Sequence, residues 1–457
     1  MTPGMLFAIL ARLRALRQRE RWERARLLAY QSQALARTRT HACAHSPFYR
    51  RFHRGLERAP LAALPVLTKA ALMEQFDEVV TDRAVRLADL ETYLDGRPVE
   101  PLFRGRYRVC ATSGSSGHRG IFLFDQGEWA AVIASFARAR EWAGLRIDLT
   151  HQVKTAVVAS ITPWHMSSMV AATGRSWWMP ELRLPASAPL ETIVARLNMW
   201  QPELLVAYAS MGHILADEQQ AGRLHISPRR IMLSSEVLTD AARRAITGVW
   251  GHVLFNQYGA TETGAIAAEC TAHHGLHVFE DHVLVEVVDA AHRPVPLGTY
   301  GAKLLVTTLF SRTVPLIRYE LSDSVRMSAA LCPAGRPFGL ISGIQGRAED
   351  ILALPGVHGD TVRVHPLVFH NVMDRVSASG WQIVQMPDGL RVLVTGLPED
   401  QDTMELGRAF EQALAEQLVA SLPVRIERVS TIPKASSGKA PLIKALHPEP
   451  LAEKAAP

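Results

Sequence analysis

The chain has 457 residues, of which 48% are hydrophobic and 21% charged, and its formal net charge at pH 7 is +6. This length suffices for two or three domains around a large core. No run of about 18 apolar residues occurs, which argues against a transmembrane helix, and residues 1–12 lack the features of a secretory signal. The four cysteines are too few for a disulfide framework, so we expect a protein of the reducing cytoplasm.

The positive charge is concentrated near the N-terminus. Residues 1–60 contain 13 arginines and 3 glutamates, whereas the rest of the chain is slightly acidic. We expect a helix over residues 12–39 that packs its leucines on the protein body and exposes its arginines. Binding of this basic lead to an anionic partner or a membrane surface is the alternative. Nucleic acid is not expected as a partner, because aromatic and basic residues do not alternate as single-strand binding requires.

A polar loop follows the mostly helical first 100 residues. Residues 112–117 combine two glycines with four hydroxyl side chains, between apolar segments at 107–111 and 121–124 that are predicted to be strands. Such a turn lets backbone N–H groups and hydroxyls surround an oxyanion, for example the phosphate tail of a nucleotide. An ordinary hairpin turn is the alternative. It is not a Walker loop, because Arg119 and Gly120 stand where that loop needs Gly-Lys-Ser/Thr.

Short aliphatic segments alternate with helical ones between residues 101 and 325. Strands are predicted at 153–161, 204–208, 230–234 and 252–257, and helices at 128–144, 189–200 and 239–250. This alternation predicts an α/β fold with a largely parallel sheet. Closely spaced strands at 283–288, 303–308 and 323–327 then predict a smaller antiparallel subdomain.

A domain boundary is predicted near residues 343–347. It separates a large N-terminal domain, 1–345, with residues 1–60 as its basic helical lead, from a small C-terminal domain, 346–457. Within the small domain, Pro387-Asp388-Gly389 between apolar runs predicts a hairpin. A helix at 401–422 and a strand at 424–429 are expected to follow.

Four further polar clusters follow the first loop in chain order: residues 256–262, 317–323, 346–350 and 433–439. Each one alone is typical of a solvated turn. Together and in this order, the five motifs resemble those of the adenylate-forming superfamily, which includes acyl-CoA synthetases, peptide-synthetase adenylation domains and firefly luciferase. The resemblance covers about residues 45–445, and Ser235-Glu236-Val237-Leu238 with residues 315–323 and 45–49 resembles the phenylacetate–CoA ligase branch.

The resemblance implies an α/β fold, with a large N-terminal domain of mixed, mostly parallel sheets and an antiparallel subdomain, and a small mobile α+β C-terminal domain. It also implies roles in ATP binding. The residues that match the loop around the β- and γ-phosphates are Thr112, Ser113, Gly114, Ser115, Ser116, Gly117 and Arg119. Ser235 and Glu236 match the strand end that flanks adenine, and Tyr258 matches the ring that packs on it. Asp323 and Arg347 match the residues that reach the ribose.

The catalytic roles implied by the resemblance fall on three residues. Lys439 matches the lysine of the adenylation step, Thr261 the hydroxyl near the α-phosphate, and Glu262 the Mg²⁺ ligand. Glu349 matches the hinge about which the small domain rotates. The residues expected to line the pocket for the acid are Trp164, His165, Tyr208, Ser210 and Ser235.

The chain departs from the family pattern at three positions. Arg119 stands where lysine is usual, which keeps the charge for phosphate contact. The hinge position holds Glu349 in place of aspartate, and Ser322 precedes Asp323 where glycine is usual. None of these changes removes a charged group.

A metal site is a further expectation. Cys270, His273, His274, His277 and Cys332 offer thiolate and imidazole ligands for Zn²⁺. Some members of the resembled branch carry a structural zinc there, with a Cys-x-Cys pair as its second half. This chain has only Cys332 in that half, so an empty vestige of the site is the alternative.

The expected function is ATP-dependent activation of a carboxylic acid, with an aromatic acid favoured, to an acyl-adenylate and pyrophosphate. This reaction needs charge neutralisation and in-line placement by Mg²⁺ and cationic side chains. Acyl transfer to coenzyme A is then expected from the resemblance. Transfer to an amine, activation of an unusual oxyacid, and a nucleotide-binding scaffold on a decayed ligase fold are the alternatives. A monomer and a homodimer are both compatible with the sequence.

Overall fold

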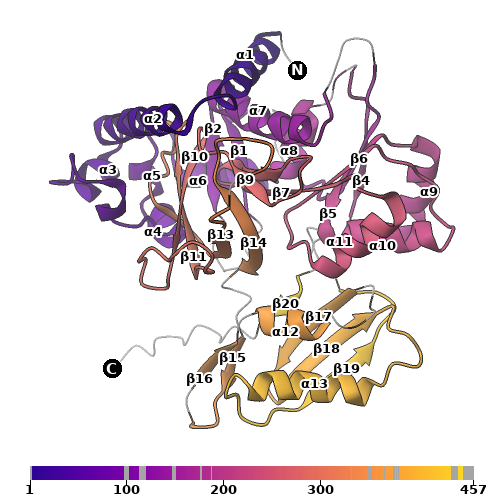
Figure 1. Ribbon diagram of the computed structural model, residues 1–457. Helices are drawn as coiled ribbons and strands as arrows, with labels where there is room; N and C mark the ends of the chain where they lie inside the picture. Colours follow the sequence, from indigo (N-terminus) through magenta and orange to yellow (C-terminus); the bar gives the residue numbers. More distant parts are fainter. Residues whose placement is uncertain are drawn as a thin grey trace.

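The computed structural model describes residues 3–96, 102–112, 120–146, 151–174, 176, 178–186, 188–330, 332–347, 352–359, 361–364, 366–373, 376, 378, 380–433 and 441–445. Elements up to β14 form the body in the upper part of Figure 1, and those from β15 onwards lie below it. No helix among these residues is long and apolar enough to cross a membrane.

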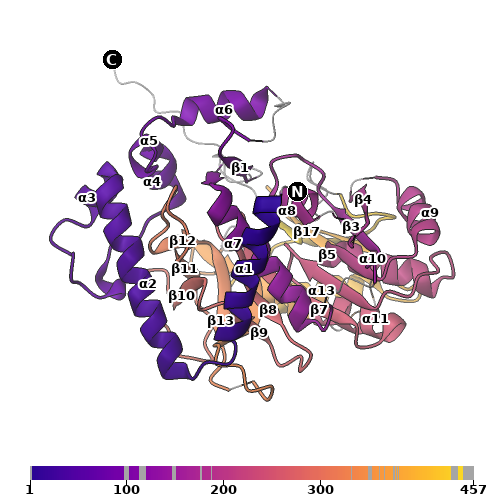
Figure 2. The same cartoon turned by 90° about the horizontal axis from the view of Figure 1, so that it is seen from above.

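The N-terminal lead consists of two long helices, so the single helix predicted over residues 12–39 is wrong. The chain starts with α1 (Pro3–Arg19), α2 (Arg24–His45), α3 (Pro47–Phe52), the 3-10 turn η1 (Leu61–Ala63), α4 (Lys69–Glu74), α5 (Phe76–Val79) and α6 (Leu87–Asp95). The break after Arg19 lets Arg19 and Glu20 reach the buried pair of Arg138 and Asp281, whose oxygen and nitrogen lie 2.7 Å apart. α1 lies along α7 (Figure 2), as expected for a helix packed on the body.

The main sheet has nine strands in the order β13-β14-β9-β8-β7-β6-β5-β3-β4. Its parallel half consists of β3 (Thr155–Ala159), β4 (Glu181–Pro185), β5 (Leu204–Tyr208), β6 (Arg230–Ser234) and β7 (Leu254–Ala260). The connecting helices are α7 (Gln126–Trp142), α8 (Met166–Gly174), α9 (Leu190–Trp200), α10 (Ala209–Gln220) and α11 (Asp240–Trp250). The predicted α/β alternation is therefore confirmed, with β4 as a strand that the prediction missed.

The antiparallel half of the main sheet joins segments that are distant in sequence. It consists of β8 (Gly264–Glu269), β9 (Leu276–Val278), β13 (Asp323–Met327) and β14 (Leu340–Arg347). β10 (Val283–Val288), β11 (Lys303–Thr308) and β12 (Tyr319–Leu321) form a separate antiparallel sheet. The expected antiparallel subdomain thus exists, but β13 pairs with β14 in the main sheet instead.

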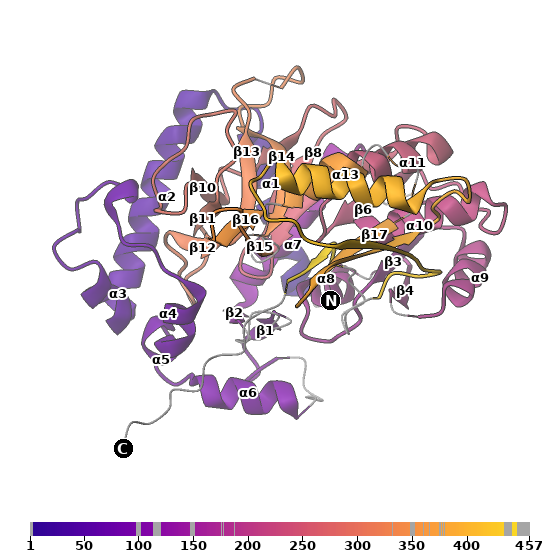
Figure 3. The same cartoon turned by 90° about the horizontal axis from the view of Figure 1, so that it is seen from below.

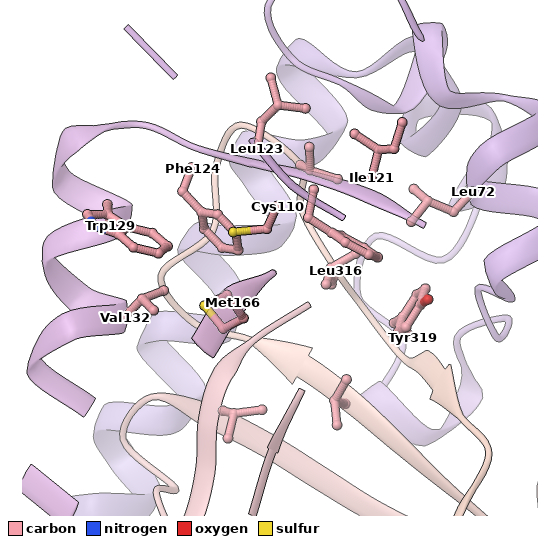
Figure 4. Close-up of a cluster of buried hydrophobic side chains, with 14 of the residues drawn as sticks. Leu72, Cys110, Ile121, Leu123, Phe124, Trp129, Val132, Met166, Leu316 and Tyr319 are labelled. Carbon is pink, nitrogen blue, oxygen red and sulfur yellow. The ribbon is translucent and has the colours of Figure 1, made fainter. Parts of the chain in front are cut away.

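A short hairpin of β1 (Arg108–Ala111) and β2 (Ile121–Phe124) packs on the main core. Figure 4 shows Cys110 and Phe124 of this hairpin beside Trp129 of α7, with Tyr319 on the far side of the same cluster. All four residues of β2 are buried, which explains why the strand is apolar at every position. The hairpin predicted around the polar loop is confirmed.

The chain after Arg347 forms sheets and a core of its own. Its elements are β15 (Leu352–Pro355), β16 (Thr361–Val364), α12 (Pro366–Met373), β17 (Gly380–Met386), β18 (Gly389–Thr395), α13 (Thr403–Ala415), β19 (Val424–Arg428) and β20 (Ile443–Lys444). Figure 3 shows α13 lying over this part. The β17–β18 hairpin is confirmed. The predicted helix over residues 401–422 ends already at Ala415, and Leu418 follows in a left-handed conformation (φ 61°) that helices do not continue through.

Candidate active site

A cleft of about 2400 Å³ lies between the body and the C-terminal part. Its lining includes residues at the carboxyl ends of β5 and β6, the turn after β7 and the start of β13. Ligands of α/β sheets bind at such strand ends. Trp381, Pro433 and Pro441 line the cleft from the C-terminal part, so the cleft is bordered by both parts of the chain.

The polar loop is closed at its base by Thr112. Its N–H donates to the carbonyl oxygen of Gly120 over 2.9 Å, and its Oγ1 accepts from the N–H of Gly120 over 2.8 Å. Thr112 lines the cleft. The other residues assigned to this loop, Ser113, Gly114, Ser115, Ser116, Gly117 and Arg119, lie outside the described residues.

Lys69, which was not predicted from the sequence, reaches the base of the same loop. Its Nζ donates to Thr112 Oγ1 over 3.3 Å, and the residue lines the cleft. Leu67, two residues earlier, exchanges backbone hydrogen bonds with Arg318 and Glu320 on either side of Tyr319. This pairing fixes Lys69 at the cleft. In the sequence, Thr68 marks only the start of the short helix α4, which it caps. The place of Lys69 at the cleft follows from the tertiary contact of Leu67 and could not be predicted from the local sequence.

The end of β7 and the turn after it place Tyr258, Thr261 and Glu262 in the cleft. A register shift lies between Tyr258 and Gly259. A Cβ on Gly259 would lie 2.6 Å from the carbonyl oxygen of Gly264, so only glycine fits this close approach. Glu262 is buried, and its Oε1 accepts a hydrogen bond of 3.3 Å from the hydroxyl of Tyr319. The side chain therefore presents a carboxylate in the wall of the cleft.

Tyr258 is joined to the start of β13. Its hydroxyl donates to Oδ2 of Asp323 over 2.6 Å. Asp323 is the register partner of Arg347 on the neighbouring strand β14, so the two residues expected to reach a ribose lie opposite each other on adjacent antiparallel strands.

The ends of β5 and β6 are linked by Glu236. Its Oε2 accepts from the backbone N–H of Ser210 over 2.9 Å. The residue before it, Ser235, has a left-handed backbone (φ 69°) and is exposed in the cleft. Non-glycine residues in this conformation are uncommon and cluster at functional sites.

Three of the residues expected in the acid pocket, His165, Tyr208 and Ser210, line the cleft together with Ser235. The fifth, Trp164, is not in this lining and packs against the main hydrophobic core. Ser160, which the sequence analysis missed, links two of the pocket residues. Its N–H donates to the hydroxyl of Tyr208 over 2.9 Å, and its Oγ lies 2.8 Å from Nδ1 of His165. Burial raises the pKa of Tyr208, so its hydroxyl stays protonated.

Lys439 and Glu349 lie outside the described residues, and so does the side chain of Arg347. The described ends of the segment that carries Lys439, Pro433 and Pro441, line the cleft.

Cys270, His277 and Cys332 form a buried cluster whose ligand atoms lie within 4.8 Å of one another. The two sulfurs are 3.8 Å apart, and Nε2 of His277 lies 3.3 Å from Sγ of Cys270. Zinc–sulfur bonds of about 2.3 Å at the tetrahedral angle separate two sulfurs by about 3.8 Å. The pKa of His277 is lowered to about 4, chiefly by burial, so the ring is neutral and able to bind a metal. The cluster thus fits three of the four ligands of a structural zinc.

The other two histidines considered as ligands lie apart from this cluster. Nδ1 of His273 is 3.6 Å from a carboxylate oxygen of Glu269, and His274 is exposed at the cleft.

Curated relatives of the chain include phenylacetate–coenzyme A ligases. The Thermus thermophilus protein is 32% identical over 177 residues, which cover 37% of this chain. The Aromatoleum evansii protein is 27% identical over 329 residues, or 68% of this chain. The Escherichia coli protein is 26% identical over 352 residues, or 73% of this chain. The alignments span 39% of the Thermus protein, 70% of the Aromatoleum protein and 74% of the Escherichia protein. No protein-family model matches the chain.

Solved structures show the same fold. A 2-hydroxyisobutyryl-CoA ligase in its postadenylation state aligns with a TM-score of 0.74 at 19% identity, over 94% of this chain and 91% of the ligase. The same ligase in its thioesterification state, over 94% and 92% of the two chains, gives a TM-score of 0.58 at 19% identity. The amide bond synthetase McbA from Marinactinospora thermotolerans aligns with a TM-score of 0.52 at 17% identity, over 73% of this chain and 67% of the synthetase. The chain thus has the fold of these adenylate-forming ligases, and over as much as 73% of its length its sequence is similar to phenylacetate–coenzyme A ligases.

Proposed function

We propose that the protein activates a carboxylic acid with ATP to give an acyl-adenylate and pyrophosphate, and then transfers the acyl group to coenzyme A. The observation that carries this proposal is the convergence of Thr112, Tyr258, Glu262 and Asp323 on one cleft, although they come from three separate parts of the chain. Their order matches the motifs for phosphate, adenine, metal and ribose.

In the first step, a carboxylate oxygen of the acid attacks the α-phosphorus of ATP. A bond forms between this oxygen and phosphorus, the bond to the β-phosphate oxygen breaks, and pyrophosphate leaves with the electron pair. The reactants are both anionic, so the site has to offset their repulsion. Thr261 would contact the α-phosphate, and Lys439 would bridge the acid and the α-phosphate.

The residues present fit a magnesium ion with the nucleotide. Glu262 supplies a hard oxygen ligand at the cleft wall, held by the hydroxyl of Tyr319. When bound, magnesium would neutralise phosphate charge; Glu262 would hold it there.

We infer that Lys69 adds a second cation at the phosphate end. Its ammonium group already touches the base of the loop that matches the β- and γ-phosphate site. A lysine acts there as a point charge that favours departure of pyrophosphate. Lys69 would thus complement Arg119, which takes the place of the usual lysine of the loop.

The acid is inferred to be aromatic, by analogy with the phenylacetate–CoA ligases that the chain resembles. His165, Tyr208 and Ser210 are its inferred neighbours, because they line the cleft, His165 from the segment between β3 and α8 and the other two from the end of β5 and the start of α10. An amine is the alternative acceptor, because the amide bond synthetase McbA has the same fold.

Acyl transfer would follow a rotation of the C-terminal part about Glu349, which withdraws Lys439 and admits the acceptor. The described arrangement resembles the postadenylation form of the 2-hydroxyisobutyryl-CoA ligase more than its thioesterification form. This difference supports the assignment of the described arrangement to the adenylation half of the cycle.

The test is a pyrophosphate-release screen over aromatic, aliphatic and amino acids, with and without Mg²⁺. We expect release only with both an acid and Mg²⁺, and an acyl-CoA product by mass when coenzyme A is added. Lys439→Ala should lower adenylation by roughly a hundredfold or more, whereas Lys444→Ala, a lysine of β20 that also lines the cleft, serves as the matched control. No release with any acid, or unchanged turnover of Lys439→Ala, would contradict the proposal.

We also infer a structural zinc held by Cys270, His277 and Cys332. It would tie the ends of β8 and β9 to the loop before β14, and it would take no part in the reaction.

A further inference from the structure

Gln382 of β17 joins the two ends of the segment that carries Lys439. Its Nε2 donates to the carbonyl oxygen of Pro441 over 2.7 Å and to that of Pro433 over 3.4 Å. These prolines flank residues 434–440, which lie outside the described residues. The orientation of the amide follows from chemistry, because only the NH₂ group can donate to two carbonyl oxygens.

The same strand holds the chain directly after this segment. The N–H of Ile383 donates to the carbonyl oxygen of Leu442 over 2.8 Å, and Ile383 is the register partner of Ile443 in the parallel strand β20. β17 therefore fixes the position at which the chain returns from residues 434–440, and Gln382 ties that position to Pro433 before the segment.

The burial of Gln382 argues that stability alone does not explain a glutamine here. Its side chain is fully buried, and its Oε1 has no hydrogen-bond partner among the described residues. An unsatisfied buried acceptor costs about 1–3 kcal/mol. Trp381 and Ile383, its neighbours on the strand, belong to the apolar core of the C-terminal part. An apolar side chain at position 382 would avoid this cost but would leave the two prolines unjoined.

Pro433 and Pro441 both line the cleft that contains Thr261 and Glu262. We propose that Gln382 is a positioning residue for the adenylation step, which holds the two ends of the Lys439 segment together at the cleft. The inference rests on the proposed function, because it acts through Lys439. Fixing both ends of a short segment lowers the conformational entropy that the segment loses when its side chains reach the reacting atoms.

The experiment compares Gln382→Met with Gln385→Met in the full chain. Methionine approximates the length of glutamine and removes the donor. Gln385 lies on the same strand, and its Nε2 donates over 2.8 Å to Ala353, away from the Lys439 segment. Two half-reactions are measured with phenylacetate, or with the acid that the screen selects: acid-dependent ATP–pyrophosphate exchange, and thioester formation from the synthetic acyl-adenylate and coenzyme A.

We expect Gln382→Met to slow the exchange reaction roughly 10- to 100-fold through kcat, with thioester formation within about twofold of wild type, because that half-reaction does not use Lys439. Gln385→Met should leave both rates near wild type. The double variant Gln382→Met/Lys439→Ala should be no slower than Lys439→Ala alone, because both changes act through one lysine.

Equal losses in both half-reactions, or an exchange rate that stays at the wild-type level, would overturn the inference. If Lys439→Ala slows exchange and Gln382→Met does not, only the inference fails. If Lys439→Ala itself has no effect, the role of Lys439 in the proposed function fails first. The melting temperatures of Gln382→Met and Gln385→Met are compared as well. If both variants lose the same amount of thermal stability but only Gln382→Met slows exchange, the slower exchange comes from lost positioning and not from lost packing.

Discussion

The hydroxyl of Tyr258 donates a hydrogen bond of 2.6 Å to Oδ2 of Asp323 and so joins the end of β7 to the first residue of β13. The two residues are 65 positions apart in the chain. The bond orients one oxygen of the carboxylate and fixes the tyrosine ring beside it. A nucleotide bound as proposed would therefore meet a ring and a carboxylate that are already placed relative to each other.

The first prediction concerns this bond. Tyr258→Phe keeps the ring but removes the donor to Asp323. A hydrogen bond to a charged group contributes about 1.5–3 kcal/mol, so we expect KM for ATP to rise roughly 10- to 100-fold with little change in kcat. Steady-state kinetics measure both constants. Tyr49→Phe is the control, because the hydroxyl of Tyr49 bonds to Pro315 in the core, outside the cleft lining. An unchanged KM for ATP would show that Asp323 is placed without Tyr258.

The second prediction concerns Lys69. Lys69→Met should lower kcat/KM for ATP roughly 10- to 100-fold, because a cation near the leaving pyrophosphate is lost. Lys69→Arg should restore part of this loss. Lys154→Met removes an exposed lysine that lies over the ring of Trp200 and outside the cleft lining, and it should have no effect. If Lys69→Met and Lys154→Met behave alike, Lys69 does not contact the phosphates.

The third prediction concerns zinc. Protein purified without chelators should contain about one equivalent of zinc by elemental analysis, and Cys332→Ala should lose most of it. The melting temperature should fall with the metal content, since binding energy of a structural metal stabilises the fold. Cys43→Ala, a change at a half-buried cysteine far along the chain from the cluster, is the control. Less than about a tenth of an equivalent in the wild-type protein would leave the cluster as an empty vestige.

The fourth prediction concerns acid stability. The pKa of His282 is lowered to about 4, chiefly because the ring is buried, against about 6.5 in an unfolded chain. Because the folded pKa is the lower one, the unfolded chain binds more protons between these values. Stability contributed by the neutral ring is therefore present above pH 6.5 and is lost as the pH falls towards 4. The loss is at most about 3 kcal/mol for this one group.

His282→Gln tests this expectation, because glutamine still offers a donor to the carbonyl of Thr263 but does not titrate. The free energy of unfolding, measured by urea titration from pH 7 to pH 4.5, should fall less steeply in this variant than in the wild type. His225→Gln, at an exposed histidine, should keep the wild-type slope. Parallel slopes for wild type and His282→Gln would assign the acid sensitivity to other groups.

Most of the regular elements of the body could be predicted from the sequence. The strands at 204–208, 230–234, 283–288 and 303–308 have the predicted bounds, because aliphatic and β-branched runs between turn residues are local signals. The helical lead was predicted as one helix because residues 20–23 contain no glycine or proline. Its break is explained by the buried charges of Arg138 and Asp281 on distant elements.

The site could be predicted where a motif is contiguous. Tyr258, Glu262 and Asp323 line one cleft, and their roles toward a nucleotide stay predictions. Lys69, Ser160 and Gln382 were missed because each stands in an ordinary local context and contacts residues far along the chain. Trp164 was expected in the pocket because Pro163-Trp164-His165 resemble a family element of the acid pocket, but its half-buried side chain packs against the main core.

The sequence by itself determined most of the strands and helices and the motifs on which the resemblance to adenylate-forming enzymes rests, because hydrophobic periodicity and glycine-containing motifs are local signals of a few residues. Only the tertiary structure decided which distant side chains meet: Tyr258 with Asp323, Lys69 with Thr112, and Gln382 with both ends of the Lys439 segment. These contacts depend on strand order and register. Both are set by packing of the whole core and by hydrogen bonds between strands that are distant in sequence.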